Sequence, residues 1–292
     1  MNSCYRFEKV TGENPLFKNI DATYVLHLEN NGRLEQVRKG LRDYFPSETT
    51  FILFNKGLKN CKKNLPKQNS IFDIIDANLT IFRDAREKNY QNILILEDDF
   101  FFHEDTRKHS HNVDEFILKK QDEEFFYFLG CIPCFVLPYD LNNYRVALGV
   151  AVHAVVYSRK YRDELLKTDQ KDITDWDMFQ IWFRPFNRYM YYKPLCYQLF
   201  SETENSKIWG SENFFLFWFA KSVVPMFHFM NLDREAEPGY SIFYFVSKMI
   251  IPIILIILAY IFRNKILKRN MAYFKMIRKV IKNSILSPIL PE

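Results

Sequence analysis

The chain has 292 residues, of which 48% are hydrophobic and 17% aromatic, with only 8 glycines and 12 prolines. These values suit one large globular domain or two small ones, and they exclude disordered, collagen-like and low-complexity sequence. The net charge of +5 is uneven, because residues 1–240 carry 31 Lys and Arg against 34 Asp and Glu, whereas residues 241–292 carry 9 against 1. A nucleic-acid-binding body would be basic. We therefore expect a membrane, and no nucleic acid, as partner.

Five cysteines are spread irregularly along the chain, at Cys4, Cys61, Cys131, Cys134 and Cys196. An odd number at this low density is not typical of a disulfide scaffold, so we expect reduced thiols. Cys131 and Cys134 form a CxxC pair without a second pair to complete a zinc site, and we interpret them as two reduced loop thiols. The N-terminal residues have no apolar core behind a basic leader and are not expected to export the chain.

Four short apolar runs, separated by polar and helix-like stretches, are predicted to be strands: Ala22–Leu28, Thr50–Phe54, Asn92–Leu96 and Phe125–Leu129. Between the second and third runs, Asn69 and Ser70 predict the start of an amphipathic helix that ends near Asn89. Near-continuous apolar strands between helices are typical of a parallel sheet covered on both faces. The predicted fold class is therefore α/β.

Later segments follow less regular patterns. Val146–Tyr157 predicts a longer strand, which a short helix over Arg159–Lys167 follows. Tyr189–Phe200 is expected to be extended, and the aromatic segment Ser211–Met230 to be helical. We expect the body to end near residue 232, giving a catalytic-type domain over residues 1–232.

A polar linker, residues 233–240, precedes the apolar segment Ser241–Phe262, whose single charge is Lys248. As a helix this segment would extend ~33 Å, against ~30 Å of bilayer hydrocarbon. We predict a membrane-inserted helix, single-pass or monotopic, although its 14 uncharged residues also fit an interfacial helix. Residues 263–292 form a basic amphipathic tail that suits an anionic bilayer surface.

The signals for orientation conflict. A basic tail would lie in the cytoplasm, which requires an exported body, whereas the N-terminal residues offer no means of export. We expect a cytoplasm-facing body. The sequon Asn78-Leu79-Thr80 does not decide the matter, because Asn78 lies on the apolar face of a predicted helix and is interpreted as unused.

Three acidic residues, Glu97-Asp98-Asp99, directly follow the apolar run Asn92–Leu96. Open α/β sheets bind ligands at the carboxyl ends of their strands. Glu97 and Asp99 project to one face of an extended chain, so they could share a divalent cation that also holds phosphates. The alternative is a solvated strand end. The polar turn that ends at Arg33 could approach a nucleotide or simply cap a helix, and the lack of a Gly-rich phosphate loop disfavours ATPases and dehydrogenases.

Taken together, these segments resemble the lipopolysaccharide-type glycosyltransferases of glycosyltransferase family 25, which are related to the procollagen galactosyltransferases. The similarity covers roughly residues 20–208. It consists of short motifs in the family's order: Tyr24–Leu28 through Arg33-Leu34-Glu35, Leu94–Asp99, Phe128-Leu129-Gly130, His153–Lys160 with Leu165-Leu166, Asp175 or Asp177, and Pro194-Leu195 with Gln198.

The resemblance implies a GT-A-like sheet that binds a nucleoside-diphosphate sugar. It implies metal-dependent, inverting transfer of a hexose, galactose or glucose, from a UDP-sugar to a glycan or protein hydroxyl. Mn²⁺ or Mg²⁺ is the implied cofactor, with Glu97 and Asp99 as its ligands. The implied donor-binding residues are His27, Leu28, Glu29, Arg33, Asp98, His153 and Gln198. Asp177 or Asp175 is the implied base, and each is equally interpretable as a cap of the helix that begins at Trp176.

The chain also departs from the family pattern. His27 stands where the family usually has Asn, the CxxC pair follows the Leu-Gly motif, and the membrane segment lies outside the match. His153 is alternatively a satisfied core histidine. A non-catalytic, membrane-anchored binding module is therefore the competing hypothesis. A metal-dependent phosphohydrolase or nuclease is weaker, because the body is net negative.

Overall fold

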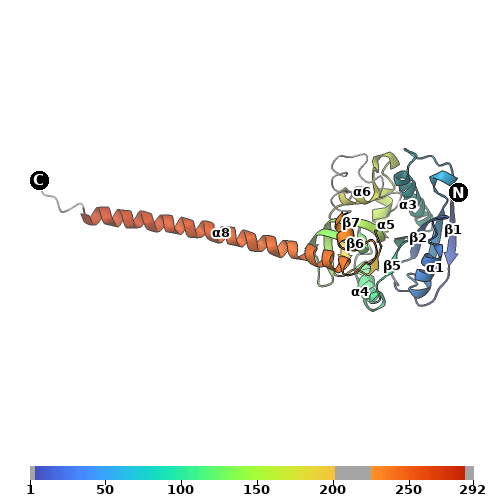
Figure 1. Ribbon diagram of the computed structural model, residues 1–292, viewed down its shortest axis with the longest axis horizontal. Coiled ribbons are helices and arrows are strands. Elements are labelled where there is room, and N and C mark those ends of the chain that lie inside the picture. Colours follow the sequence, from blue (N-terminus) through green and yellow to red (C-terminus); the bar gives the residue numbers. More distant parts are fainter. Residues whose placement is uncertain (1–3, 201–224, 287–292) are drawn as a thin grey trace. The chain divides into compact units, whose positions relative to one another are not determined.

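The computed structural model describes residues 4–200 and 225–286 (Figure 1). The chain divides into two compact units, residues 1–247 and residues 248–292. The body therefore extends past the expected boundary at residue 232, and it includes the first residues of the C-terminal helix α8 (Gly239–Leu286). Most of the expected helix over Ser211–Met230 lies outside the described residues.

A seven-stranded sheet forms the centre of the body, in the order β1 (Tyr5–Val10), β3 (Thr50–Asn55), β2 (Ala22–Leu28), β4 (Asn92–Glu97), β7 (Asn143–Ser158), β6 (Phe126–Pro138) and β8 (Arg188–Tyr191). A second, two-stranded sheet joins β5 (Phe101–Phe102) to β9 (Cys196–Tyr197). The strand predicted over Ala22–Leu28 is observed with the same bounds as β2. The strand predicted over Phe125–Leu129 is observed as the longer β6.

The sheet is mixed, so the expectation of a parallel sheet is wrong in its outer parts. Strands β3, β2 and β4 are parallel to one another, whereas β1 is antiparallel to β3. Strand β7 is antiparallel to both β4 and β6. Strands β6 and β7 are antiparallel because a short turn joins them, in which Asp140 accepts the backbone N–H groups of Asn142 and Asn143. Two strands joined by so short a connection pair antiparallel.

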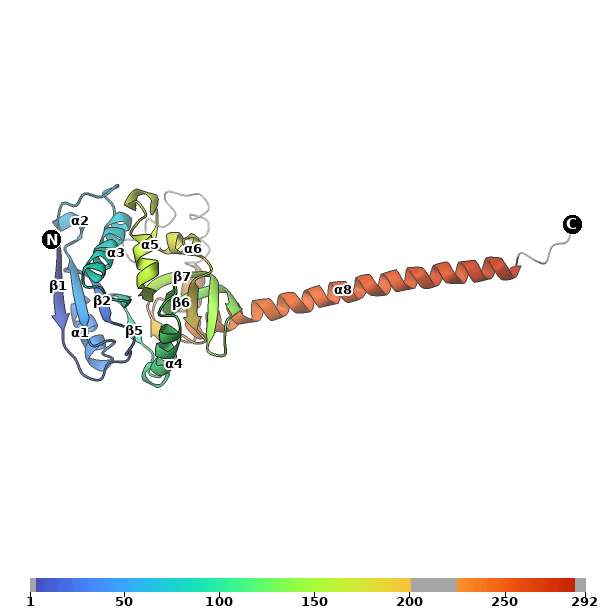
Figure 2. The same cartoon turned by 180° about the vertical axis from the view of Figure 1, so that it is seen from behind.

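The larger helices are α1 (Leu34–Asp43), α3 (Ser70–Glu87), α4 (Thr106–Lys119), α5 (Arg159–Leu165) and α6 (Trp176–Trp182); α2 (Gly57–Asn60) and a 3₁₀ turn at Gln170–Asp172 are short. The Asn69 carboxamide accepts the backbone N–H of Phe72 and caps α3 as predicted. Side chains alternate across the sheet: Tyr24 packs in the core with α3, α5 and α6, and Val25 in the core with α1 and α4. Figures 1 and 2 show these two helical layers, and the predicted α/β arrangement with both faces covered is confirmed.

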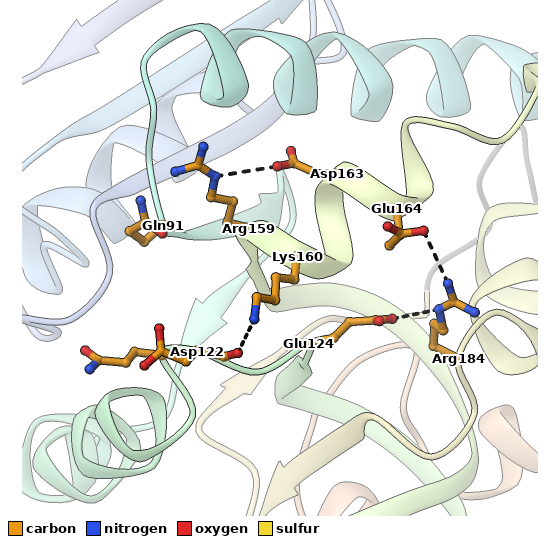
Figure 3. Close-up of a pocket in the computed structure, with 9 residues that line it drawn as sticks. Gln91, Asp122, Glu124, Arg159, Lys160, Asp163, Glu164 and Arg184 are labelled. Carbon is orange, nitrogen blue, oxygen red and sulfur yellow. Dashed lines mark hydrogen bonds and ion pairs between the residues drawn. The ribbon is translucent and has the colours of Figure 1, made fainter.

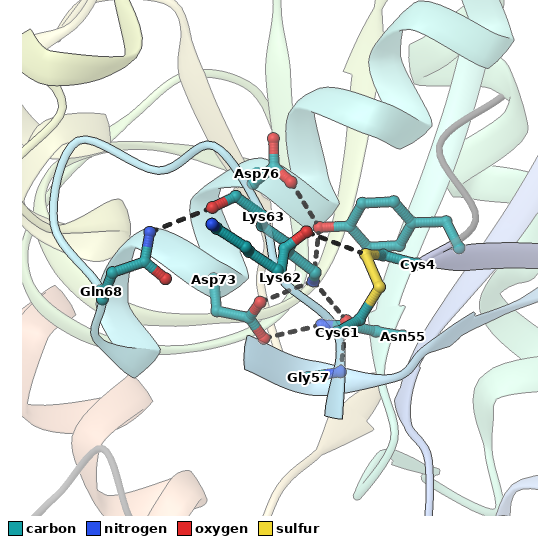
Figure 4. Close-up of a disulfide and its surroundings, with 10 residues drawn as sticks. Cys4, Asn55, Gly57, Cys61, Lys62, Lys63, Gln68, Asp73 and Asp76 are labelled. Carbon is teal, nitrogen blue, oxygen red and sulfur yellow. Dashed lines mark hydrogen bonds and ion pairs between the residues drawn. A yellow bond between two sulfur atoms is a disulfide. The ribbon is translucent and has the colours of Figure 1, made fainter. Parts of the chain in front are cut away.

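Cys4 and Cys61 form a disulfide, so the expectation that all five cysteines are reduced is wrong (Figure 4). The antiparallel pairing of β1 with β3 places Cys4 near the residues that follow β3, although 57 residues separate the two cysteines. Beside the disulfide, the buried ammonium of Lys63 donates to Tyr5, Asn55 and Asp73 at 2.6–2.8 Å. All three ammonium donors are thus used, which offsets the cost of burying the charge.

The other three cysteines, Cys131, Cys134 and Cys196, are free. Cys131 and Cys134 are not in a loop as expected but within β6. Asn78 of the sequon is buried in α3, where its side-chain amide donates to the Ile74 carbonyl. An N-linked glycan needs an exposed asparagine, so this burial supports the interpretation of the sequon as unused.

The predicted membrane segment lies within one helix of 48 residues, α8, which has Pro252 inside it; the described part of the predicted tail, to Leu286, continues the same helix. Within α8, Gly239–Ile281 has a mean hydropathy of 2.5 in its most apolar window and is long and apolar enough to cross a membrane. The expectation of a C-terminal helix compatible with membrane insertion is confirmed at this level.

Candidate functional site

The site is assembled where the parallel strands β2 and β4 end side by side. Leu26 lies opposite Glu97 in the ladder, so the turn after β2 faces the acidic residues after β4. Asn30 and Gly32 in this turn have positive φ angles of 65° and 81°, which reverse the chain before α1. Strand pairing alone therefore brings residues about seventy positions apart into contact.

Asp98 is the residue that holds this turn together. Its Oδ2 atom lies 3.0 Å from Nδ1 of His27 and accepts hydrogen bonds from the Leu28 N–H and the Asn31 amide. Its Oδ1 atom accepts a hydrogen bond from Arg33 at 3.1 Å. Burial raises the pKa of Asp98. The hydrogen bonds and the Arg33 charge together lower it by more than burial raises it, so the net shift of the pKa is downward. Asp98 is thus a buried, ionised anchor for the turn.

Glu97 and Asp99 face the same side chain, the Gln198 amide just beyond β9. Nε2 of Gln198 donates to Oε2 of Glu97 at 3.2 Å and to Oδ2 of Asp99 at 3.1 Å. Arg33 also donates to Oδ2 of Asp99, at 3.0 Å. The two carboxylates therefore meet at one amide, but Asp99 reaches it from the turn that follows β4 and not from the extended chain on which the expectation was based. The small β5–β9 sheet brings Gln198 to them.

Burial and mutual repulsion dominate the electrostatics of this pair. The pKa of Glu97 is raised well above its usual range by burial and by the nearby Asp99 and Asp177 carboxylates. Burial also raises the pKa of Asp99, despite the opposing effects of Arg33 and Gln198. Asp99 is only 8% exposed and Asp98 is also buried, whereas Glu97 is half-buried. Such carboxylates are stabilised in their ionised form by an added positive charge.

The donor set partly fits a divalent cation. Oδ1 of Asp99 is buried and has no hydrogen-bond partner within residues 4–200 and 225–286, which leaves one carboxylate oxygen free to coordinate. In that same part of the chain, no three His, Cys, Asp or Glu side chains are grouped as metal ligands. Two carboxylates nevertheless suffice for Mg²⁺ when substrate phosphates and waters supply the other ligands.

Asp175 and Asp177 lie at the start of α6. Asp175 is the N-cap residue and accepts the Met178 N–H at 2.9 Å, so it occupies the capping position considered above. Asp177 accepts the N–H of Ala151, whose φ of 68° marks an irregularity within β7. Burial, together with the Asp175 charge, raises the pKa of Asp177 to about 7. Of the two, Asp177 is the one poised for proton transfer near neutral pH.

The remaining expected donor-binding residues are placed as follows. His27 is buried and packs its ring edge-on against Phe54, and Leu28 is exposed. The backbone N–H of Glu29 donates to the Asn55 carbonyl. His153 is fully buried on β7, with Nε2 3.3 Å from the Cys196 carbonyl oxygen. Its Nδ1 atom is buried without a hydrogen-bond partner in the described residues, so it is not the fully satisfied core histidine considered above.

His153 predicts a pH dependence of stability. Burial lowers its pKa to about 4, below the unfolded value of ~6.5. As the pH falls, His153 is therefore protonated in the unfolded chain before it is protonated in the folded one. Its contribution to the free energy of unfolding is complete above pH ~6.5 and is lost between pH ~6.5 and pH 4, by about 3 kcal/mol. We expect His153→Gln to reduce the dependence on pH of the free energy of unfolding, measured with urea between pH 7 and pH 4. Equal slopes in both proteins would contradict the prediction.

No protein-family model matches this chain, and the search of curated proteins found no match. The assignment of function therefore depends on the residues and their geometry. Asn31, in the polar turn before Arg33, has no role predicted from the sequence, yet it makes the shortest contact of Asp98, at 2.6 Å. Tyr240, expected in the linker, is buried in the body and bonded to Gln198. No local pattern distinguishes Tyr240, because its partner is 42 residues away.

An open cavity of about 700 Å³ lies away from the acidic residues, at the start of β4 beside Gln91, whereas Glu97 ends that strand (Figure 3). Its charged side chains are largely bonded within the chain: Arg159 with Asp163, Lys160 with the Asp122 carbonyl, and Arg184 with Glu124 and Glu164. We assign this cavity no role in the candidate site.

Proposed function

We propose that the body is a metal-dependent, inverting glycosyltransferase of the GT-A type, resembling family 25. It transfers a hexose, galactose or glucose, from a UDP-sugar to a hydroxyl of a glycan or protein. The observation that carries the proposal is the Glu97–Asp99 pair, which meets the Gln198 amide at the carboxyl end of β4 beside the turn after β2. This is where open α/β sheets bind nucleotides.

Each residue has a chemical role in this proposal. Glu97 and Asp99 hold Mn²⁺ or Mg²⁺, which when bound supplies Lewis-acid stabilisation of the departing diphosphate. Arg33 is paired with Asp98 and Asp99 and adds positive charge near the diphosphate oxygens. Asp98 keeps Arg33 and the turn in place. Asp177 takes the proton of the acceptor hydroxyl, for which a pKa of about 7 is suited.

The competing function is a membrane-anchored binding module that retains the fold without catalysis. It is favoured by the hydrogen bonds that the two proposed metal ligands already make within the chain. Gln198 donates to both Glu97 and Asp99, and Arg33 donates to Asp99. Asp177 likewise accepts a backbone N–H. In this alternative the polar cluster only holds the ends of the strands together.

UDP release from UDP-galactose and UDP-glucose, with water as the acceptor, distinguishes the two functions. With the full chain in detergent, we expect release with Mn²⁺ and none with EDTA. Calorimetry with UDP provides the second measurement. Mn²⁺-dependent UDP binding without turnover would favour a binding module, and no Mn²⁺-dependent binding at all would exclude the metal-dependent proposal.

We also propose an orientation for the body, the reverse of the one expected from the N-terminal residues. The Cys4–Cys61 disulfide is of a kind that forms and persists in oxidising compartments. The basic tail, with 9 Lys and Arg against 1 acid over residues 241–292, favours the cytoplasmic side. Both observations support a body on the oxidising side of a membrane that α8 crosses.

A further inference from the structure

The first two turns of α8 are part of the packed body. Tyr240 and Tyr244 are 0% and 2% exposed, and Ser247, the last residue of the first compact unit, is also buried. The ring of Tyr240 packs edge-on against Tyr197, with centroids 5.0 Å apart, and against His153 at 6.2 Å. The start of the helix therefore packs directly on β7 and on β9, the strand that Gln198 directly follows.

Tyr240 makes polar contacts with Gln198. Its hydroxyl oxygen accepts the Gln198 backbone N–H at 3.2 Å, and the hydroxyl donates to the Gln198 carbonyl at 3.1 Å. Gln198 follows the last residue of β9, so neither of these backbone groups takes part in the β5–β9 ladder. One hydroxyl thus satisfies both backbone groups of a residue beyond the end of its strand.

The side chain of Gln198 then continues the connection to the acidic pair, because its amide donates to both Glu97 and Asp99. We infer that Tyr240 is a positioning residue: through the Gln198 backbone it sets where the amide stands, and hence the spacing of the two carboxylates. This inference rests on the proposed function. It makes the beginning of α8 a required part of the metal and donor site, in addition to its place in the apolar helix.

The test compares Tyr240→Phe with Tyr244→Phe in the full chain in detergent. Each change removes one hydroxyl and keeps a buried ring on the same helix, but the Tyr244 hydroxyl contacts Sγ of Cys131, at 3.8 Å, and not Gln198. Calorimetry measures the Mn²⁺ affinity, and UDP release measures KM for the donor and kcat. We expect Tyr240→Phe to weaken Mn²⁺ binding by about tenfold, the effect of losing hydrogen bonds to an ordered ligand support. Tyr244→Phe should retain wild-type affinity.

A double-mutant cycle provides a readout that a loss of stability would not mimic. In a Gln198→Ala background the amide is absent, so Tyr240→Phe should weaken Mn²⁺ binding no further. A wild-type chain that binds no Mn²⁺ removes both the proposed function and this inference. Wild-type binding with equal affinities in the two tyrosine variants, or additive losses in the cycle, overturns the inference alone.

Discussion

We expect Asp99→Asn to reduce Mn²⁺-dependent UDP release by about 10²- to 10³-fold, because weaker metal binding removes the positive charge that stabilises the departing diphosphate, and the loss of one such electrostatic contribution has an effect of this size. The variant retains an oxygen that can accept hydrogen bonds from Arg33 and Gln198, whose distances to Oδ2 are 3.0 and 3.1 Å. It removes the negative charge from the carboxylate whose second oxygen is buried without a hydrogen-bond partner in the described ranges. The loss should therefore reflect metal binding more than folding.

The control is Asp105→Asn, which changes an exposed aspartate whose partner is Lys193 at 2.6 Å. This variant should release UDP at the wild-type rate. Thermal unfolding provides the second measurement, since Mn²⁺ should raise the melting temperature of the wild type and of Asp105→Asn but not of Asp99→Asn. Unchanged UDP release by Asp99→Asn would refute the metal-binding role.

Removal of the disulfide is expected to have the largest effect on stability. Cross-linking residues 57 positions apart restricts the unfolded chain by about 4 kcal/mol in the loop-entropy description. We expect Cys61→Ser to lower the free energy of unfolding by that amount, and the melting temperature by on the order of 10 °C. Cys134→Ser is the control, because its thiol is free and half-buried. Equal melting temperatures of Cys61→Ser and the wild type would contradict this expectation.

The same cysteine pair reports the orientation of the body in cells. If the body lies on the oxidising side, chains alkylated before lysis should migrate on non-reducing gels as the disulfide-bonded form, with Cys61→Ser marking the reduced mobility. Protease added to sealed vesicles gives an independent measurement, because the body and the basic tail should be cut from opposite sides. A fully reduced body would reverse the proposed orientation.

Local patterns were most informative where one element determines its own structure. The bounds of β2 and the Asn69 cap of α3 follow from a short, nearly continuous apolar run and from capping chemistry within a few residues. The position of Glu97-Asp98-Asp99 after a buried strand was visible for the same reason. These features depend only on residues that are close in the sequence, so they can be predicted from one amino-acid sequence.

Contacts between distant segments were not visible in the same way. The antiparallel insertion of β7, the Cys4–Cys61 bond and the Gln198 contacts join residues tens of positions apart. In sequence, the buried start of α8 falls partly in the predicted polar linker, which ends at Tyr240, and partly in the predicted membrane segment, which begins at Ser241. Only the packing of Tyr240 against β9 shows that it belongs to the body.

The sequence alone therefore determined the α/β class, the acidic strand end and the apolar C-terminal helix, since the pattern of apolar residues within each element reflects its burial and its periodicity. Only the tertiary structure decided which carboxylates face each other, since chain folding brings Glu97, Asp99 and Gln198 together from two different sheets. It also decided which cysteines pair and where the body ends. The physical reason is that these contacts are set by strand pairing and helix packing over long stretches of chain, and such pairings are not encoded in any short run of residues.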